Sequence, residues 1–106
     1  MSTPATPDLP LEQFERGDVD PALFDHEAHI YMGWLYVSRF GRKEGITRFD
    51  AALQRLVTRI GAESKYNAMI TWLFLVLIAD RARNDEDWAA FRSRNADLID
   101  DRPKAA

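Results

Sequence analysis

The stretch MITWLFLVLIA, residues 69–79, decides the fold of this chain of 106 residues. Eleven helical residues span about 16 Å, roughly half of a bilayer's hydrocarbon core, so the stretch is too short to cross a membrane. Lys65 and Asp80 flank it with charge. A helix that is apolar on every side is surrounded by protein. The stretch therefore predicts either the central, most buried helix of a bundle or a helix shared across a subunit interface.

Length and composition indicate one soluble globular domain. The chain is 46% hydrophobic and 29% charged, with five Gly and five Pro, which is an ordinary globular profile. It contains no Cys, which excludes disulfides and thiolate metal sites. The opening MSTPATPDLP has neither a basic start nor an apolar core. We therefore expect no secretory signal and a cytoplasmic location.

Capping and breaking residues predict an all-α fold. A short N-terminal helix is followed by four helices, and their short connections favour an antiparallel bundle. We expect a disordered lead-in over residues 1–7, one helical domain over 8–99 and a polar tail over 100–106. The expected N-cap of the first helix is Asp8, and that of the second is Asp20 or Asp25, so the second helix begins at Pro21 or at His26. A capping box of Thr47 and Asp50 starts the third helix, and Ser64 caps the fourth. The acidic run 85–87 forms the first turn of the last helix.

Glycines mark the expected helix ends and one close approach. Gly17, Gly41 and Gly61 each follow an apolar helical pattern, where a left-handed residue ends a helix. Gly33 instead lies inside the second helix, where it costs about 1 kcal/mol relative to Ala. It suggests that another backbone passes close to this position.

Charge is distributed unevenly along the chain. The net charge is −3, which argues against a dedicated nucleic-acid binder. Residues 1–38 carry a balance of −6 and residues 39–106 a balance of +3. The two parts should therefore attract each other, or attract a second copy. Five basic residues could bind a phosphate backbone, but no nucleic-acid motif frames them and we interpret them as a solvated helix face: Arg42, Lys43, Arg48, Arg55 and Arg59.

The two histidines are the first candidates for chemistry. His26 and His29 are three residues apart, so on a helix both project from one face, which continues inward. Neutral imidazoles bind zinc, iron or copper, and a metal here would also use Asp25, Glu27 or Glu63. Position 23 is Leu, where a di-iron bundle would place a Glu, and no other helix contains a His. Helix capping with ordinary packing, and acid–base use without metal, remain alternatives.

A second polar group stands at the start of the apolar helix. Asn67 and Thr71 are four residues apart and need partners, because a buried unpaired polar group costs about 1–3 kcal/mol. In an up-down bundle the second and fourth helices are parallel, so their starts lie at the same end. We expect either a closed hydrogen-bonded cluster or a ligand pocket, whose dipoles would attract a carboxylate or small anion. The expected pocket residues are His26, His29, Tyr66, Asn67 and Thr71.

The order of these residues resembles a group of small, uncharacterised bacterial all-helical domains with the patterns F-x-H-x-x-H, W-L-Y, K-Y-[HN], T, W-x-x-F and N-x-D-L. The resemblance covers roughly residues 9–99 and implies an all-α domain with no named activity. It also implies a third His in relatives, where this chain departs with Asn67. The residues that carry it are Phe24, His26 and His29; Trp34, Leu35 and Tyr36; Lys65, Tyr66 and Asn67; Thr71; Trp88 and Phe91; and Asn95, Asp97 and Leu98.

No motif of nucleophilic catalysis, phosphate binding or dinucleotide binding occurs in the sequence. The expected function is a non-enzymatic binding or protein-interaction module of a bacterial cytoplasm, either a homo-oligomer or an accessory subunit, without nucleic acid or membrane partners. Abundant aromatics beside an apolar helix favour a C2 dimer. The alternative is a helical-bundle enzyme or sensor subunit that uses His26 and His29 for metal binding or acid–base chemistry.

Overall fold

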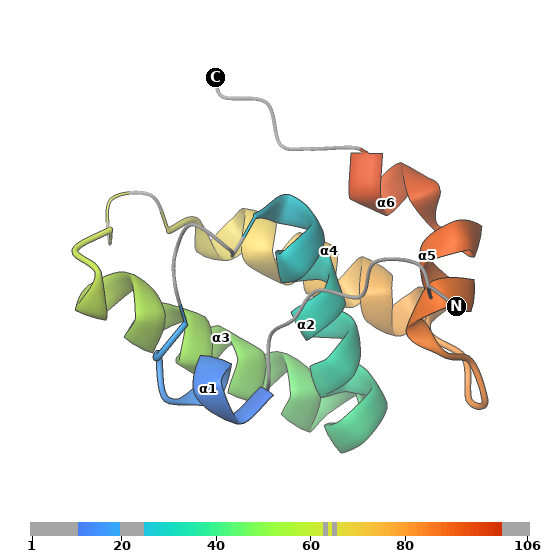
Figure 1. Ribbon diagram of the computed structural model, residues 1–106, viewed down its shortest axis with the longest axis horizontal. Helices are drawn as coiled ribbons and strands as arrows, with labels where there is room; N and C mark the ends of the chain where they lie inside the picture. Colours follow the sequence, from blue (N-terminus) through green and yellow to red (C-terminus); the bar gives the residue numbers. More distant parts are fainter. Residues whose placement is uncertain (1–10, 20–24, 63, 65, 101–106) are drawn as a thin grey trace, which may run out of the picture.

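A computed structural model describes residues 11–19, 25–62, 64 and 66–100, and this part of the chain is helical without strands (Figure 1). The all-α class is confirmed. The expected lead-in, the caps at Asp8 and Asp20, and the tail beyond Asp100 lie outside the described residues. The helices are α1 (Leu11–Glu15), α2 (His26–Phe40), α3 (Arg42–Arg59), α4 (Ala68–Arg81), α5 (Trp88–Arg94) and α6 (Ala96–Asp100).

Helix α2 is the centre of the packing. It contacts α3, α4 and α6, while α3 also packs against α1 and α4. Figure 1 shows α3 and α4 running in opposite directions with α2 lying across them. Asp25 is the N-cap of α2, which settles the open start of this helix at His26. None of the helices in the described part of the chain is long and apolar enough to span a membrane.

Aromatic side chains fill the core in two clusters. The first joins α1, α2 and α3 through the rings of Phe14, Tyr36 and Phe49, whose centroids lie 5.2–5.8 Å apart. The second joins α2 to α5 through Trp34, Trp88 and Phe91, at 5.7–6.1 Å. Offset and edge-to-face rings at these distances stabilise a core beyond their buried area.

Helix α3 begins earlier than the sequence predicts. The expected capping box of Thr47 and Asp50 is wrong, because α3 starts at Arg42 and Thr47 donates its hydroxyl to the Lys43 carbonyl, one turn back. The reason is Gly45. A Cβ at this position would lie 2.7 Å from the Tyr36 carbonyl oxygen, so the glycine lets the first turn of α3 pack directly on the backbone of α2.

The close backbone approach expected at Gly33 therefore occurs at Gly45. A Cβ on Gly33 would meet only the side-chain tips of Ile78 and Leu75, at 3.0 and 3.1 Å. The expected helix-ending role of Gly17, Gly41 and Gly61 is confirmed, since each has a φ between 71° and 87°. Left-handed backbone of this kind is where glycine has no steric cost.

Helix α4 differs from its prediction in two ways. Its N-cap is Asn67 and not Ser64. It is also not the most buried helix of the single chain, because only Leu75 and Ile78 are buried, whereas seven residues of α2 are. The packing explains this difference, since α4 packs against α2 and α3 while most of its first six residues are exposed.

The acidic first part and the basic remainder attract each other within one chain. Glu15 pairs with Arg48, Asp18 with Arg59, and Glu27 with Arg92. These pairs fasten α1, the following turn and the start of α2 to α3 and α5. Arg55 and Arg59 also donate to backbone carbonyls of Glu15 and Gly17. The arginines of α3 thus hold the N-terminal segment, in addition to being exposed.

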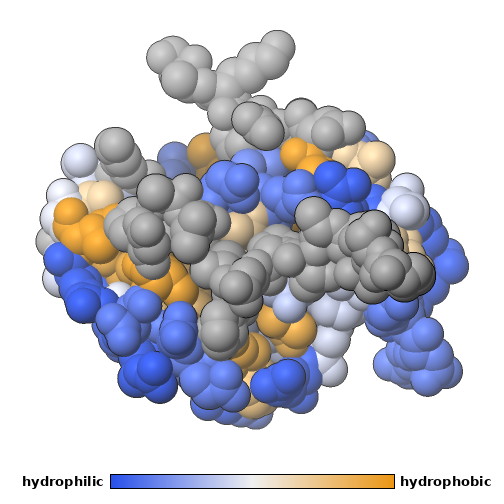
Figure 2. Space-filling model, in the orientation of Figure 1, coloured by the Kyte–Doolittle hydropathy of each residue, from blue (hydrophilic) through white to orange (hydrophobic). Residues whose placement is uncertain are grey.

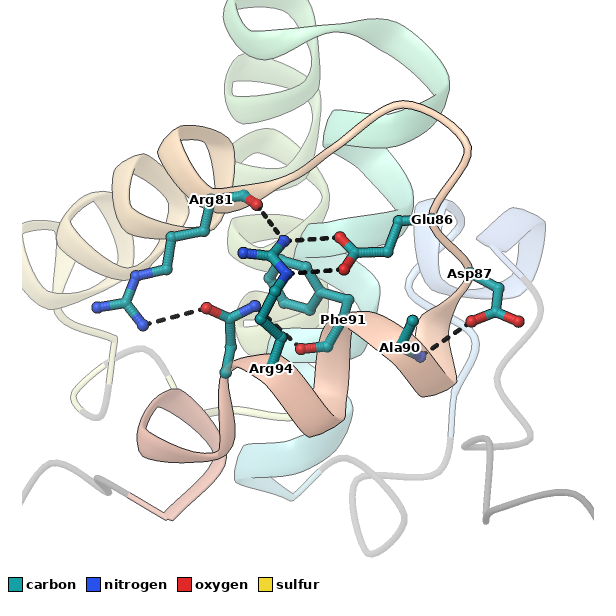
Figure 3. Close-up of polar contacts among 7 residues, drawn as sticks. Arg81, Glu86, Asp87, Ala90, Phe91 and Arg94 are labelled. Atoms are coloured by element: carbon teal, nitrogen blue, oxygen red, sulfur yellow. Dashed lines mark hydrogen bonds and ion pairs between the residues drawn. The ribbon is translucent and has the colours of Figure 1, made fainter.

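The expected last helix is divided into α5 and α6 at Asn95. This side chain is 2% exposed, donates to the Phe91 carbonyl at 2.9 Å and accepts from Arg81. Figure 3 shows the guanidinium of the preceding residue, Arg94, between the carboxylate of Glu86 and the Arg81 carbonyl. The acidic run 85–87 is not the expected first turn of α5, which begins at Trp88; its last member, Asp87, is instead the N-cap and accepts from the Ala90 N–H at 2.9 Å. Arg81 also binds Asp97, so one arginine contacts both the break at Asn95 and the start of α6.

Candidate functional site

The starts of α2 and α4 meet at one cavity of about 350 Å³. Asp25 caps α2 by accepting from the Ala28 N–H at 2.9 Å, and Asn67 caps α4 by accepting from the Ile70 N–H at 3.0 Å. These caps fix the first turns whose side chains face the cavity. The lining residues are Asp25, His26, His29, Ile30, Phe49, Asn67, Ile70, Thr71, Phe74, Leu75 and Ile78.

The cavity has an apolar floor and a polar mouth. Ile30, Phe49, Leu75 and Ile78 form the floor, and each is 2% exposed or less. The polar lining residues are all more accessible: Asp25 and Asn67 are exposed, and His26, His29 and Thr71 are half-buried. A concave apolar surface with a few convergent polar groups is the usual form of a small-molecule site.

Four of the five predicted site residues line this cavity. His26, His29, Asn67 and Thr71 lie together there, as the expected common end of the second and fourth helices requires. Tyr66 does not line it. Its hydroxyl donates instead to the carboxylate of Asp50 on α3. Burial and this bond to Asp50 raise the pKa of Tyr66 to about 12, so the hydroxyl stays protonated as a structural donor.

His26 is held by the far end of the chain. Its Nε2 donates to the Leu98 carbonyl oxygen in α6 at 2.8 Å, and its ring lies edge-to-face on Phe74, 5.3 Å between centroids. The carbonyl can only accept, so Nε2 carries the proton. In the neutral ring, Nδ1 is then a hydrogen-bond acceptor.

His29 is fixed by its own helix. Its Nδ1 donates to the Asp25 carbonyl at 3.1 Å, which assigns the proton to that nitrogen. Burial is the largest effect and lowers the pKa of His29 below 6.5; the bond to the Asp25 carbonyl raises this pKa by less, and the nearby His26 lowers it further. His29 is therefore a neutral imidazole at pH 7.

The additional metal ligands suggested by the sequence do not gather around the histidines. Glu27 forms a two-point ion pair with Arg92, and Asp25 is the helix cap. Glu63 lies outside the described residues. Within the described ranges, no group of three His, Asp or Glu side chains is placed to hold a metal. The metal site stays a hypothesis that rests on His26 and His29.

A second surface lies on the opposite side of α4. Met69, Trp72, Leu73 and Val76 follow the spacing i, i+3, i+4, i+7, and we call this stripe the outer face of α4. Met69 is 81% exposed, Leu73 56% and Trp72 41%. Ile60, at the end of α3, is also exposed. Hydrophobic surface appears in Figure 2 on the side of the molecule where α3 ends and α4 begins.

The apolar floor of the cavity is the part that sequence reasoning missed. Phe49 comes from α3, and nothing in its own sequence neighbourhood links it to the histidines. Ile30 could have been found, because it stands four residues after His26 and so shares a helix face with it.

Comparison of the chain with family models, with curated proteins and with solved structures found no match. The resemblance to the bacterial helical domains stays an expectation drawn from the residue pattern.

Proposed function

We propose that this protein is a self-associating interaction module whose contact surface is the outer face of α4, packed against the same face of a second copy. The observation that supports it is the stripe of Met69, Trp72, Leu73 and Val76, of which the first three are exposed and Val76 is half-buried. A helix that is apolar on two sides and covered on one has a side left for a partner.

The composition of the stripe suits an interface. Trp and Met are enriched at the centres of protein interfaces, and charged residues are depleted there. The outer face contains no charge over two turns of helix. A two-fold axis near Trp72 and Leu73, at the middle of the stripe, would bring these two side chains onto their counterparts and each end of the stripe onto the opposite end of the other copy's stripe.

Charge attraction between copies contributes little to this association. Among the described residues, Glu15, Asp18 and Glu27 of the acidic part already pair with arginines of the same chain. Exposed ion pairs are worth about 0–1 kcal/mol in any case. Association through the outer face of α4 should therefore be driven by apolar burial and depend weakly on salt.

The alternative function, metal or acid–base chemistry at His26 and His29, has weaker support. One nitrogen of each ring donates to a backbone carbonyl. The neighbouring carboxylates are also engaged, because Asp25 caps α2 and Glu27 pairs with Arg92. These partners orient the rings, yet they also explain the histidines without any reaction.

Sedimentation equilibrium tests the proposed association. The wild-type chain of 12.2 kDa should approach twice that mass as its concentration rises. Leu73→Glu places a charge in the middle of the stripe and should return the mass to that of the monomer, because a charge is costly to bury in an apolar contact.

The matched control is Ala51→Glu, which adds the same charge at an exposed position of α3 and should leave the dimer unchanged. Circular dichroism verifies that both variants keep the helical fold. A wild-type chain that stays monomeric up to high micromolar concentration, or a Leu73→Glu variant that still dimerises, contradicts the proposed interface.

A further inference from the structure

The cavity between α2 and α4 points to a ligand site on the inner side of α4, independent of the outer face. We infer that it binds a small neutral aromatic molecule that carries a single hydrogen-bond donor, such as a phenol. The ring would rest on the apolar floor, and the donor would be accepted at the polar mouth.

The size and floor of the cavity favour an aromatic body. A volume of about 350 Å³ is at the lower end of small-molecule sites. The floor offers aliphatic and aromatic side chains from three helices, namely Ile30, Phe49, Leu75 and Ile78. Phe74 adds a half-buried ring at the side. Stacked and edge-to-face contacts with these rings stabilise an aromatic ligand more than its area alone.

Two acceptors at the mouth, on His26 and Asp25, suit a ligand that donates, and the amide of Asn67 and hydroxyl of Thr71 beside them are neutral. The bond from His26 Nε2 to Leu98 leaves Nδ1 as an acceptor in the neutral ring. Asp25 adds a carboxylate that accepts only. Among the described lining residues there is no Lys or Arg.

The electrostatics of the mouth favour a neutral ligand over an ion. Each helix N-terminus is equivalent to about half a positive charge, so the starts of α2 and α4 together offset the single negative charge of Asp25. An anion would meet the carboxylate of Asp25, and a cation would meet two positive dipole ends. The structure therefore does not favour the carboxylate or small anion expected from the sequence.

Four probes of one shape test the site by calorimetric titration: p-cresol, toluene, 4-methylbenzoate and 4-methylbenzylamine. We expect p-cresol to bind three- to tenfold more tightly than toluene, which is about 0.6–1.4 kcal/mol and the usual worth of one hydrogen bond. Both charged probes should bind more weakly than p-cresol. Binding should shift the NMR methyl signals of Thr71 and Ile78.

His26→Phe identifies the acceptor while keeping the shape of the ring. This variant should bind p-cresol no better than toluene, and its toluene affinity reports whether the cavity is still formed. The control is Tyr66→Phe, which removes a hydroxyl that binds Asp50 and does not line the cavity, and should leave both affinities unchanged.

Two outcomes would overturn the assignment. Absence of binding by any probe at millimolar concentration means that the cavity is not a site, and tighter binding of 4-methylbenzoate or 4-methylbenzylamine than of p-cresol means that its chemistry is ionic. Should His26→Phe fail to fold, the affinities of the wild type for the four probes decide whether the assignment holds.

Titration of the monomeric Leu73→Glu variant with the same probes should give the wild-type affinities, which separates this site from the outer face of α4.

Discussion

The side chain of His26 at the start of α2 donates from Nε2 to the carbonyl oxygen of Leu98, 72 residues away in α6. Leu98 belongs to the last turn of its helix, where carbonyls have no partner within the helix. The bond therefore satisfies a carbonyl of a buried residue that has no other partner among the described residues. It joins the C-terminal helix to the centre of the fold.

Loss of this bond should destabilise the chain. We expect His26→Phe to lower the free energy of unfolding by about 1–3 kcal/mol, since the edge-to-face contact with Phe74 can persist while the Leu98 carbonyl is left without a donor. Urea denaturation followed by circular dichroism measures the loss. An unchanged unfolding midpoint would mean that the carbonyl finds another partner.

The approach of α3 to α2 makes a sharp prediction about two glycines. Gly45→Ala should cost about 1–3 kcal/mol, because its Cβ would lie 2.7 Å from a backbone oxygen that cannot move alone. Gly33→Ala is the matched control. It meets only flexible side-chain tips and gains about 1 kcal/mol of helix propensity, so its net effect should be small. Equal losses for the two variants would contradict the described packing.

These glycines also show where sequence reasoning succeeds and where it stops. Helix ends at Gly17 and Gly61 follow from left-handed backbone, which is a local property, and they were predictable. The start of α3 was not, because packing of Gly45 against Tyr36 outweighs the capping signal at Thr47. The same limit applies to the cavity. Its polar members share two helix starts and were predictable, whereas Phe49 reaches it only through tertiary packing.

The buried hydroxyl of Tyr36 should contribute nothing favourable. Within the described part of the chain this hydroxyl has no hydrogen-bond partner. Its burial costs the free energy of desolvation, and no hydrogen bond offsets that cost. We expect Tyr36→Phe to be neutral or to stabilise by up to about 1 kcal/mol. Tyr66→Phe, the matched control, loses a hydroxyl that donates to Asp50 and should destabilise by about 0.5–1.5 kcal/mol. Thermal denaturation of both variants checks the opposite signs.

His29 should make stability depend on mildly acidic pH. Burial lowers its pKa in the folded state below the ordinary 6.5, so the unfolded chain takes up a proton first as the pH falls. The contribution of His29 to the free energy of unfolding is therefore complete above pH 6.5. It is lost as the pH falls toward the folded-state pKa, by at most about 1.4 kcal/mol per pH unit.

The measurement is urea denaturation of the wild type and His29→Gln between pH 7.5 and 5.5. Glutamine does not titrate, so the loss attributable to this position should disappear in the variant. A variant that loses as much stability as the wild type over this range would assign the pH dependence to other groups.

Disulfide trapping tests the interface on α4 most directly, because the chain has no cysteine of its own. Single Cys variants at Met69, Trp72, Leu73 and Val76 are oxidised under mild conditions and compared with Ala51→Cys, an exposed position on α3. If the outer faces of two copies meet around a two-fold axis, Cys at position 72 or 73 gives a covalent dimer in high yield and the control does not. Yields on the stripe no higher than that of Ala51→Cys would show that the outer face of α4 is not where copies of this protein meet.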